Sequence, residues 1–600
     1  MMSMMKKIPY LPLCMAAATV FLCGVAAGQL DPERYITLDE IDTDMEAYTL
    51  TVWSGTEIER FDLKILSIVL NRQPGEDMIL VLGLDERLKA SGAVQGVSGS
   101  PVYIDGRLAG ALAAGWMGSL EPLYLVRPIE NMLQVGAASQ AAAAPSGSGH
   151  MTLDVSGPLD LSAIYDQAMA KQSRLNSMDS LPLALATSLP AEVCRQLSGS
   201  DIVAGATLLP GALTTSAAGQ AVDVPIEPGS VLSAVLCTGD INLAALGTAT
   251  DVQGDTIYGF GHSFTGLGAV QFPMAAGTVH TVVAGRTRSF KFSSPGPILG
   301  TIEYDQNAAV RGRIGAIPTM VPLRISVERF NDPEVRVYDC KLAFDRQFTP
   351  LIARLVVQAS ALMQGPLPPE HTVRYKGRIE AAGREAIVFD NISSGRSVAE
   401  MGMEILSTLT LLLNNPFELV RPEAIDVELF IEPGDSTAGI WSAQLSRTTV
   451  KPGQTVTANL MLQTFRASRT AASIELTIPD SMPAGKHTLH LMGAAAYNSF
   501  LTQHAPHRFR VVDTDSLLTG LDQVLNMPRN KLYAVLPVPA TGLTMRRHAL
   551  PDLPPTRMAL MQDPKRLEPA EPYRNWIQNS VVLDTIISGA VQVELTVEHP

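Results

Sequence analysis

The sequence predicts a mainly β protein built from several modules, and three observations support this. The chain has 600 residues, which at roughly 100–200 residues per domain is too long for one small domain. Apolar and polar residues alternate in short segments such as 48–53 and 61–66, as in half-buried strands. Glycine (47) and proline (41) recur without a period, as turn residues between strands do.

The first 28 residues are predicted to be a secretory signal peptide. Lys6 and Lys7 precede an uncharged apolar stretch over 11–27, and small residues stand at Ala26 and Gly28. An uncleaved membrane anchor is the alternative. No later stretch is long and apolar enough to span a bilayer, so we expect an exported protein, in the periplasm, in the cell envelope or outside the cell.

Cysteines do not provide a covalent framework. Five occur, and removal of residues 1–28 leaves Cys194, Cys237 and Cys340, so at least one thiol is free or pairs between chains.

The segments up to residue 345 are predicted to be strands on both sides of a linker. Residues 29–135 contain a hairpin signal, Asp105-Gly106, between two apolar runs. The small-residue run at 136–150 predicts a linker, which we extend over 136–175. Residues 176–345 again read as short strands with Gly and Pro turns.

The remaining segments divide into three predicted parts. Residues 346–424 form a small α+β module, because helical spacing over 351–365 and 396–414 flanks two short strands. Residues 425–512 return to evenly spaced alternating strands and predict an immunoglobulin-like β-sandwich. Residues 513–600 are Pro-rich and end in a strand over 591–597.

The sharpest chemical motif is residues 96–101, GVSGSP. A serine flanked by glycines on a tight turn is a way to present a nucleophile, here Ser98. The same bend aims the backbone N–H groups of Gly96 and Ser98 at one point, where they can form an oxyanion hole. An ordinary Gly-Ser β-turn is the alternative explanation.

A serine nucleophile needs a base, and His262 is the leading candidate. It lies in the glycine-rich segment 259–268 (GFGHSFTGLG), and His280 is a competing base. The pairs His487 and His490, and His504 and His507, are interpreted as surface histidines, because no cysteine or acid cluster completes a metal site. We therefore expect neither a metal nor an organic cofactor.

An acid that orients the imidazole would complete the site. Asp85 lies 13 residues before Ser98, and Glu86 is the alternative. A solvated surface turn over Asp85, Glu86 and Arg87 is the simpler interpretation.

Together, these segments resemble the SpoIVB-type serine peptidase family. The resemblance covers about residues 45–135 and 200–330, and its most specific stretch is 92–111. It implies a chymotrypsin-like double β-barrel and a His-Asp-Ser triad in which Ser98, His262 and Asp85 take the three places. The serine half precedes the histidine half here, as in a circular permutation, which a triad defined by geometry tolerates.

These observations favour an exported serine endopeptidase that acts on protein or peptide substrates, with a possible partner in the cell envelope. The alternative is a non-catalytic envelope scaffold or binding protein that retains the peptidase-like fold. A formal net charge of −14 argues against nucleic-acid binding, which needs a basic face.

Overall fold

The protein is described here by a computed structural model. It describes residues 30–73, 76–116, 118–137, 151–174, 184–197, 207–210, 225–286, 288–395, 397–464, 467–545, 547–562 and 570–599. The predicted signal peptide and residues 138–150 of the predicted linker lie outside these ranges. The prediction of a mainly β chain is confirmed.

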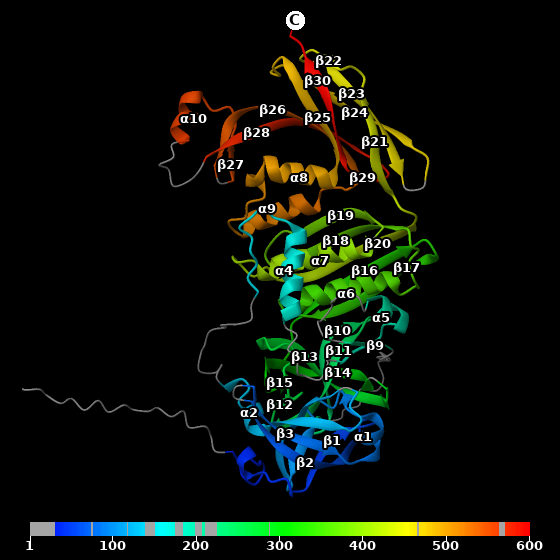
Figure 1. The fold of residues 1–600 in the computed structure, drawn as a ribbon, viewed down its shortest axis with the longest axis vertical. Helices are drawn as coiled ribbons and strands as arrows, with labels where there is room; N and C mark the ends of the chain where they lie inside the picture. The colour runs from blue at the N-terminus through cyan, green and yellow to red at the C-terminus, as the bar shows by residue number, and fades with distance from the viewer. Residues whose placement is uncertain are drawn as a thin grey trace, which may run out of the picture.

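The N-terminal module is a closed six-stranded β-barrel (blue in Figure 1). Its strands, in order around the barrel, are β1 (Ala47–Val52), β2 (Ile58–Gln73), β3 (Glu76–Gly83), β7 (Leu123–Pro128), β6 (Arg107–Gly115) and β5 (Pro101–Ile104). The helices around it are η1 (Leu38–Glu40), α1 (Glu86–Ser91) and α2 (Ile129–Leu133). The turn from β5 to β6 is the predicted Asp105-Gly106 pair, with positive φ at both residues.

Six further strands close into a second ring. They are β10 (Val231–Gly239), β11 (Leu243–Gln253), β12 (Thr256–Gly259), β15 (Ala309–Ile314), β14 (Ser289–Gln306) and β13 (Gly268–Val283), which pairs back onto β10. Numbered along the chain, the strands of both rings are joined in the order 1-2-3-6-5-4. β4 (Val94–Gln95) of the N-terminal module pairs with β14 and joins the two rings.

The second ring is part of a larger sheet, which continues from β10 into a middle module. That part contains β17 (Asp332–Ala343), β16 (Met320–Arg329), β20 (Pro422–Pro433), β18 (His371–Ala381) and β19 (Ile387–Ser394). The short elements β8 (Ala184–Thr187), β9 (Thr207–Pro210) and α5 (Ala191–Leu197) lie at the other end, where β8 pairs with β11.

Helices cover one face of the middle module (Figure 1). The two long ones, α6 (Phe348–Leu362) and α7 (Ser397–Asn414), lie within a few residues of the predicted helices. A third helix, α4 (Leu161–Arg174), packs against α7. α4 lies inside the segment 136–175 that was predicted to be a linker. The small-residue composition that indicated a linker is confined to residues 136–150, so the predicted linker was too long.

The C-terminal module contains two packed β-sheets with one apolar core between them. One sheet holds β21 (Thr437–Leu445), β23 (Thr455–Thr464), β24 (Thr470–Thr477) and β29 (Ile586–Ser588). The other holds β22 (Thr449–Val450), β25 (Gly485–Gly493), β26 (Lys531–Met545), β27 (His548–Leu550), β28 (Glu571–Val582) and β30 (Ala590–Val597). Four helices belong to the chain segments that connect these strands: α8 (Ala494–His504), η2 (Pro506–Arg508), α9 (Thr514–Leu525) and α10 (Pro555–Met561).

The sandwich therefore differs from the predicted bounds 425–512 at both ends. It begins after β20, which belongs to the sheet of the middle module, and it does not end at residue 512. Strands β26 to β30 belong to it, although the sequence analysis set 513–600 apart. Strand partners come from long-range pairing, which a local hydrophobic pattern does not encode.

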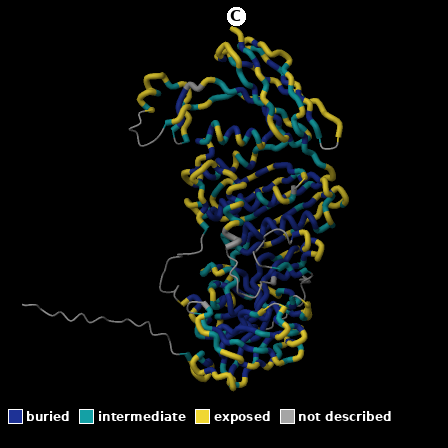
Figure 2. The backbone as a smooth tube through the Cα atoms, in the orientation of Figure 1, coloured by how far each residue is buried: buried dark blue, intermediate teal, exposed yellow. Residues whose placement is uncertain are grey.

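Buried residues are concentrated inside the two rings and beneath the helices of the middle module (Figure 2). Among the described helices, none combines the length and the apolarity that crossing a membrane requires.

Candidate active site

Ser98 lies in the loop between the third and fourth strands of the N-terminal barrel. The loop bends at Gly96 and Gly99, whose φ angles are +93° and +90°. It is anchored by hydrogen bonds from the Gly99 amide to the Leu112 carbonyl (2.7 Å) and from the Ser100 amide to the Val97 carbonyl (2.9 Å). Ser98 itself is 4% exposed.

His262 occupies the corresponding place in the second ring, after its third strand, β12, and before its fourth, β13. The chain turns there through Phe260 and Gly261, both at φ +67°. Phe260 is fully buried and its ring meets the His262 imidazole edge-on. His262 is 6% exposed.

The two loops meet at one interface. The amide of Thr248 donates to the Ser98 carbonyl (2.8 Å), and the carbonyl of Thr248 accepts from the Phe260 amide (3.2 Å). Gly99 approaches Phe260 so closely that a Cβ on it would lie 2.3 Å from the Phe260 nitrogen. The structure thus brings together the loops of the predicted nucleophile and base. Nε2 of His262 has no hydrogen-bond partner among the described residues, so the bond between Ser98 and His262 is not formed here.

The imidazole of His262 is held through its other nitrogen. Nδ1 lies 2.8 Å from the carbonyl oxygen of Ser263. A carbonyl only accepts hydrogen bonds, so Nδ1 carries the hydrogen and Nε2 keeps its lone pair in the neutral ring. Burial lowers the pKa of His262, against the effect of the Ser263 carbonyl, and the charge of Arg127 adds to the lowering. The neutral form of His262 is therefore favoured.

Asp85, the predicted acid, has different partners. It is the N-cap of α1, and its carboxylate accepts from the Arg87 amide (2.8 Å) and from the Arg87 guanidinium (3.2 Å to Nε). Burial acts to raise the pKa of Asp85, but the hydrogen bonds and charge of Arg87 outweigh it, so the pKa is lowered. No hydrogen bond joins Asp85 to His262 among the described residues. The alternative acid, Glu86, pairs with Lys89 on the surface of α1.

A carboxylate that was not among the predicted site residues binds the segment that follows His262. Asp305, at the end of β14, is fully buried and accepts from the amides of Phe264 (2.7 Å), Thr265 and Gly266 (3.0 Å) and from the Thr265 hydroxyl. These residues follow His262 directly in the chain. Burial raises the pKa of Asp305, and the four hydrogen bonds act against that rise. The sequence around Asp305 contains no motif that signals such a role.

A buried lysine beneath the serine loop was also missed. Lys291 on β14 is 2% exposed and packs against Gly96. Its Nζ donates to the Thr51 hydroxyl (2.6 Å), which in turn accepts from the Ser100 hydroxyl (2.9 Å). Burial lowers the pKa of Lys291 to about 7. Only the folding of β14 against the N-terminal barrel puts this residue near the loop.

The other candidate histidines have ordinary partners. His280, the competing base, is exposed on β13 and lies 2.8 Å from the Ser294 hydroxyl through Nε2. His487 and His504 contact backbone carbonyls. Within the described ranges, no group of three His, Cys, Asp or Glu side chains is arranged to hold a metal ion.

No curated protein and no solved structure matches this chain. Its residues 32–133 match the family model of the SpoIVB peptidase S55. The matched segment contains Asp85 and Ser98, whereas His262 lies outside it. The N-terminal barrel is therefore similar to the SpoIVB-type serine peptidases, and the match supports the resemblance that the motifs of this segment indicated.

Proposed function

We propose that the protein is an exported serine endopeptidase in which Ser98 is the nucleophile and His262 the general base. The observation that carries this proposal is the contact between the two loops, in which an unpartnered Nε2 is available on a histidine whose Nδ1 is bonded elsewhere. The family match supports the reaction class.

The mechanism follows from these positions. Nε2 of His262 takes the proton of the Ser98 hydroxyl as Oγ bonds to the carbonyl carbon of a peptide. The backbone N–H groups of Gly96 and Ser98 hold the oxyanion. His262 then gives the proton to the leaving amine as the C–N bond breaks. Water, deprotonated by the same nitrogen, attacks the acyl carbon, and Nε2 returns this proton to Ser98 Oγ as the ester bond breaks.

The substrate class and the partners belong to the same proposal, whereas the acid does not. The family resemblance assigns the place of the acid to Asp85, but the Asp85 carboxylate pairs with Arg87 at the start of α1. The substrate class is protein or peptide, and a cell-envelope protein is a candidate partner for the C-terminal sandwich.

The test is covalent labelling by a serine-reactive fluorophosphonate probe, together with hydrolysis of an unstructured protein substrate. We expect the wild-type protein to be labelled, and Ser98→Ala and His262→Ala to lose labelling and hydrolysis. Ser67→Ala is the matched control, because Ser67 is an exposed serine on β2 of the same barrel. Labelling that persists in Ser98→Ala would contradict the assignment.

A non-catalytic scaffold is the second candidate, and the burial of the site favours it. With Ser98 4% and His262 6% exposed, a peptide bond reaches them only if the interface between the rings opens. A folded wild-type protein that the probe does not label, before or after limited proteolysis, would favour the scaffold.

A further inference from the structure

We propose that Asp305 and the Ser263 carbonyl, rather than Asp85, orient the imidazole of His262. This inference rests on the proposed function, since it assigns a positioning role within the same site. Ser263 holds the ring directly, and Asp305 holds the segment that carries Ser263.

Nδ1 of His262 already has a hydrogen-bond acceptor, the carbonyl oxygen of Ser263. The orienting group of a serine peptidase must accept a hydrogen bond from Nδ1, so that Nε2 faces the nucleophile with its lone pair. The Ser263 carbonyl does this at 2.8 Å. Nε2 is left buried and without a partner among the described residues, so its lone pair is free to accept the Ser98 proton.

The segment that carries the Ser263 carbonyl is held in place by Asp305. A backbone oxygen orients a ring well only if its segment is fixed. Asp305 fixes it with four accepted hydrogen bonds, three from the consecutive amides of Phe264, Thr265 and Gly266 and one from the Thr265 hydroxyl. Asp305 is fully buried, so water does not compete for these hydrogen bonds.

The Asp85 carboxylate already has partners of its own at the start of α1. It caps α1 and pairs with Arg87, which itself pairs with Glu59. Rotation of Asp85 toward His262 would leave the α1 cap unfilled and the Arg87 pair broken. The observed contacts give Asp85 a structural role at the start of α1.

The proton balance of the reaction needs no further acid. The hydrogen on Nδ1 stays there throughout, while Nε2 receives the Ser98 proton and passes it to the leaving amine. Between these two proton transfers the ring is positively charged, and the Ser263 carbonyl oxygen, bonded to Nδ1, stabilises this charge. Asp305 therefore acts through the loop and does not touch the reacting atoms.

The experiment combines probe labelling of Ser98 with NMR of the histidine ring nitrogens in the full chain. We expect His262 of the wild-type protein to be the neutral tautomer with hydrogen on Nδ1. In Asp305→Asn, one donor in the loop loses its acceptor, so we expect mixed tautomers and labelling slower by about 10- to 100-fold, as small misplacements of a catalytic group produce. Thr265→Val, which removes one donor and leaves the carboxylate, should show the same changes to a smaller extent.

One variant serves as the control. Asp251 is an equally buried aspartate of the same ring, paired with Arg34 and Tyr35, so Asp251→Asn should keep the Nδ1–H tautomer and near-wild-type labelling. Asp85→Asn tests the acid that the family resemblance implies, and the inference expects it to keep the tautomer and the labelling as well.

The outcomes separate the two proposals. The inference is overturned if Asp305→Asn keeps the wild-type tautomer and labelling rate, or if Asp85→Asn loses them. Absence of labelling in the wild-type protein would contradict the proposed function alone, because the tautomer measurement still decides which residue orients the ring.

Discussion

Asp85 and Asp305 are the same residue type in two environments, and the environments decide what each carboxylate does. The sequence around Asp85 contains a local signal for its observed role, because an aspartate before Glu86 and Arg87 is typical of a helix N-cap. The sequence around Asp305 contains no comparable signal. Its hydrogen bonds go to residues about 40 positions earlier, which only the pairing of β13 with β14 brings near. Ser98 and His262 could be singled out as candidates because their glycine-rich surroundings are local.

Lys291 gives a prediction at the level of a single residue. Its folded pKa of about 7 lies below the ordinary value of 10.5. Between these pH values the unfolded chain binds more protons than the folded one, so the stability of the wild-type protein should rise as pH rises from about 7 to 10.5. Lys291→Met removes this term, and we expect it to be more stable than wild type at pH 7 by up to several kcal/mol.

The measurement is thermal unfolding of both proteins across that pH range. The difference between them should shrink toward pH 10.5 and level off above it, where Lys291 is neutral in both states. A difference that stays constant with pH would mean that the burial of Lys291 does not carry a proton-linked cost.

The close packing of the serine loop gives a second prediction. A Cβ at Gly99 would lie 2.1 Å from the Thr248 carbonyl oxygen, at φ +90°. Neither backbone segment can move away cheaply, so Gly99→Ala should separate the two loops, slow the labelling of Ser98 and lower stability by more than about 1 kcal/mol.

Gly106→Ala is the matched control. Gly106 also has a positive φ, +76°, but nothing lies within 4 Å of its Cβ position. Its cost is the backbone strain alone, about 1–2 kcal/mol, and labelling should be unaffected. Equal labelling of the two variants would show that the contact between the loops does not position Ser98.

At the scale of elements, the helices and strands with a strong hydrophobic period could be predicted, whereas the pairing of distant strands could not. α6 and α7 have strong helical spacing, and the strand pairs of the N-terminal barrel have local turn signals. The parallel pairing of β16 with β20 joins residues about 100 positions apart and has no local signal. The two rings share one strand order although the sequence shows no internal repeat, because ring topology depends on which edges pair and tolerates many sequences.

The end of α6 gives a prediction at this scale. Arg329 on β16 is buried, and its guanidinium donates to the carbonyls of Gly365 (2.8 Å) and Pro366 (2.6 Å), just beyond the helix. Arg329→Met fills similar space but leaves these carbonyls without that donor, so we expect a loss of about 1–3 kcal/mol in unfolding free energy.

Arg324→Met is its control, measured by denaturant unfolding in parallel. Arg324 lies on the same strand, and its ion pair with Asp339 is exposed on both sides, so its loss should stay within about 0.5 kcal/mol. Similar losses in both variants would argue against the role of Arg329 at the end of α6.

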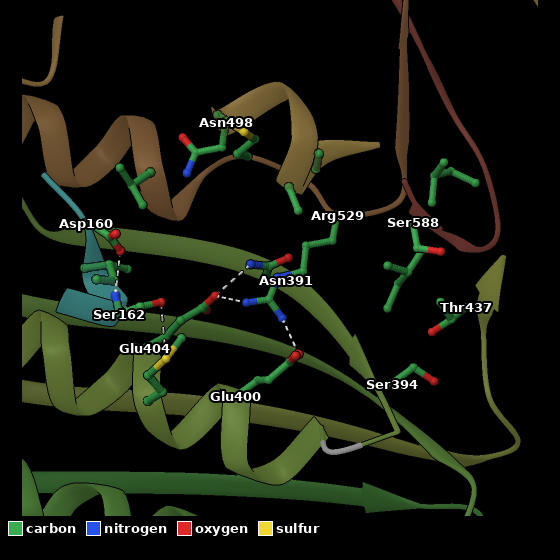
Figure 3. A pocket seen from close by; sticks show the side chains of 18 of the residues that line it. Asp160, Ser162, Asn391, Ser394, Glu400, Glu404, Thr437, Asn498, Arg529 and Ser588 are labelled. Atoms are coloured by element: carbon green, nitrogen blue, oxygen red, sulfur yellow. Dashed lines mark hydrogen bonds and ion pairs between the residues drawn. The ribbon is translucent and has the colours of Figure 1, made fainter. Parts of the chain in front are cut away.

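At the scale of the whole molecule, an ionic cluster centred on the buried Glu404 joins the middle module to the C-terminal sandwich. It lies beside a cavity of ≈490 Å³ between them (Figure 3). Arg529, just before β26, pairs with Glu400 and Glu404 of α7, and Glu404 also accepts from the Tyr375 hydroxyl (2.5 Å). Burial raises the pKa of Glu404, and the charge of Arg529 acts against this rise.

Arg529→Met should therefore destabilise the protein by about 3–5 kcal/mol, because it leaves a buried carboxylate without its cation. The effect should depend on pH with a definite sign. Without Arg529 the folded pKa of Glu404 rises further above its unfolded value, so the folded variant takes up a proton that the unfolded chain releases. The stability of the variant then falls as pH rises, and its deficit should be larger at pH 8 than at pH 5.

Lys486→Met, which removes the exposed pair with Glu594, is the control for loss of a cation. Calorimetric scans at both pH values would measure the deficit, and one that is equal at pH 5 and pH 8 would show that Glu404 is not the group left unpaired.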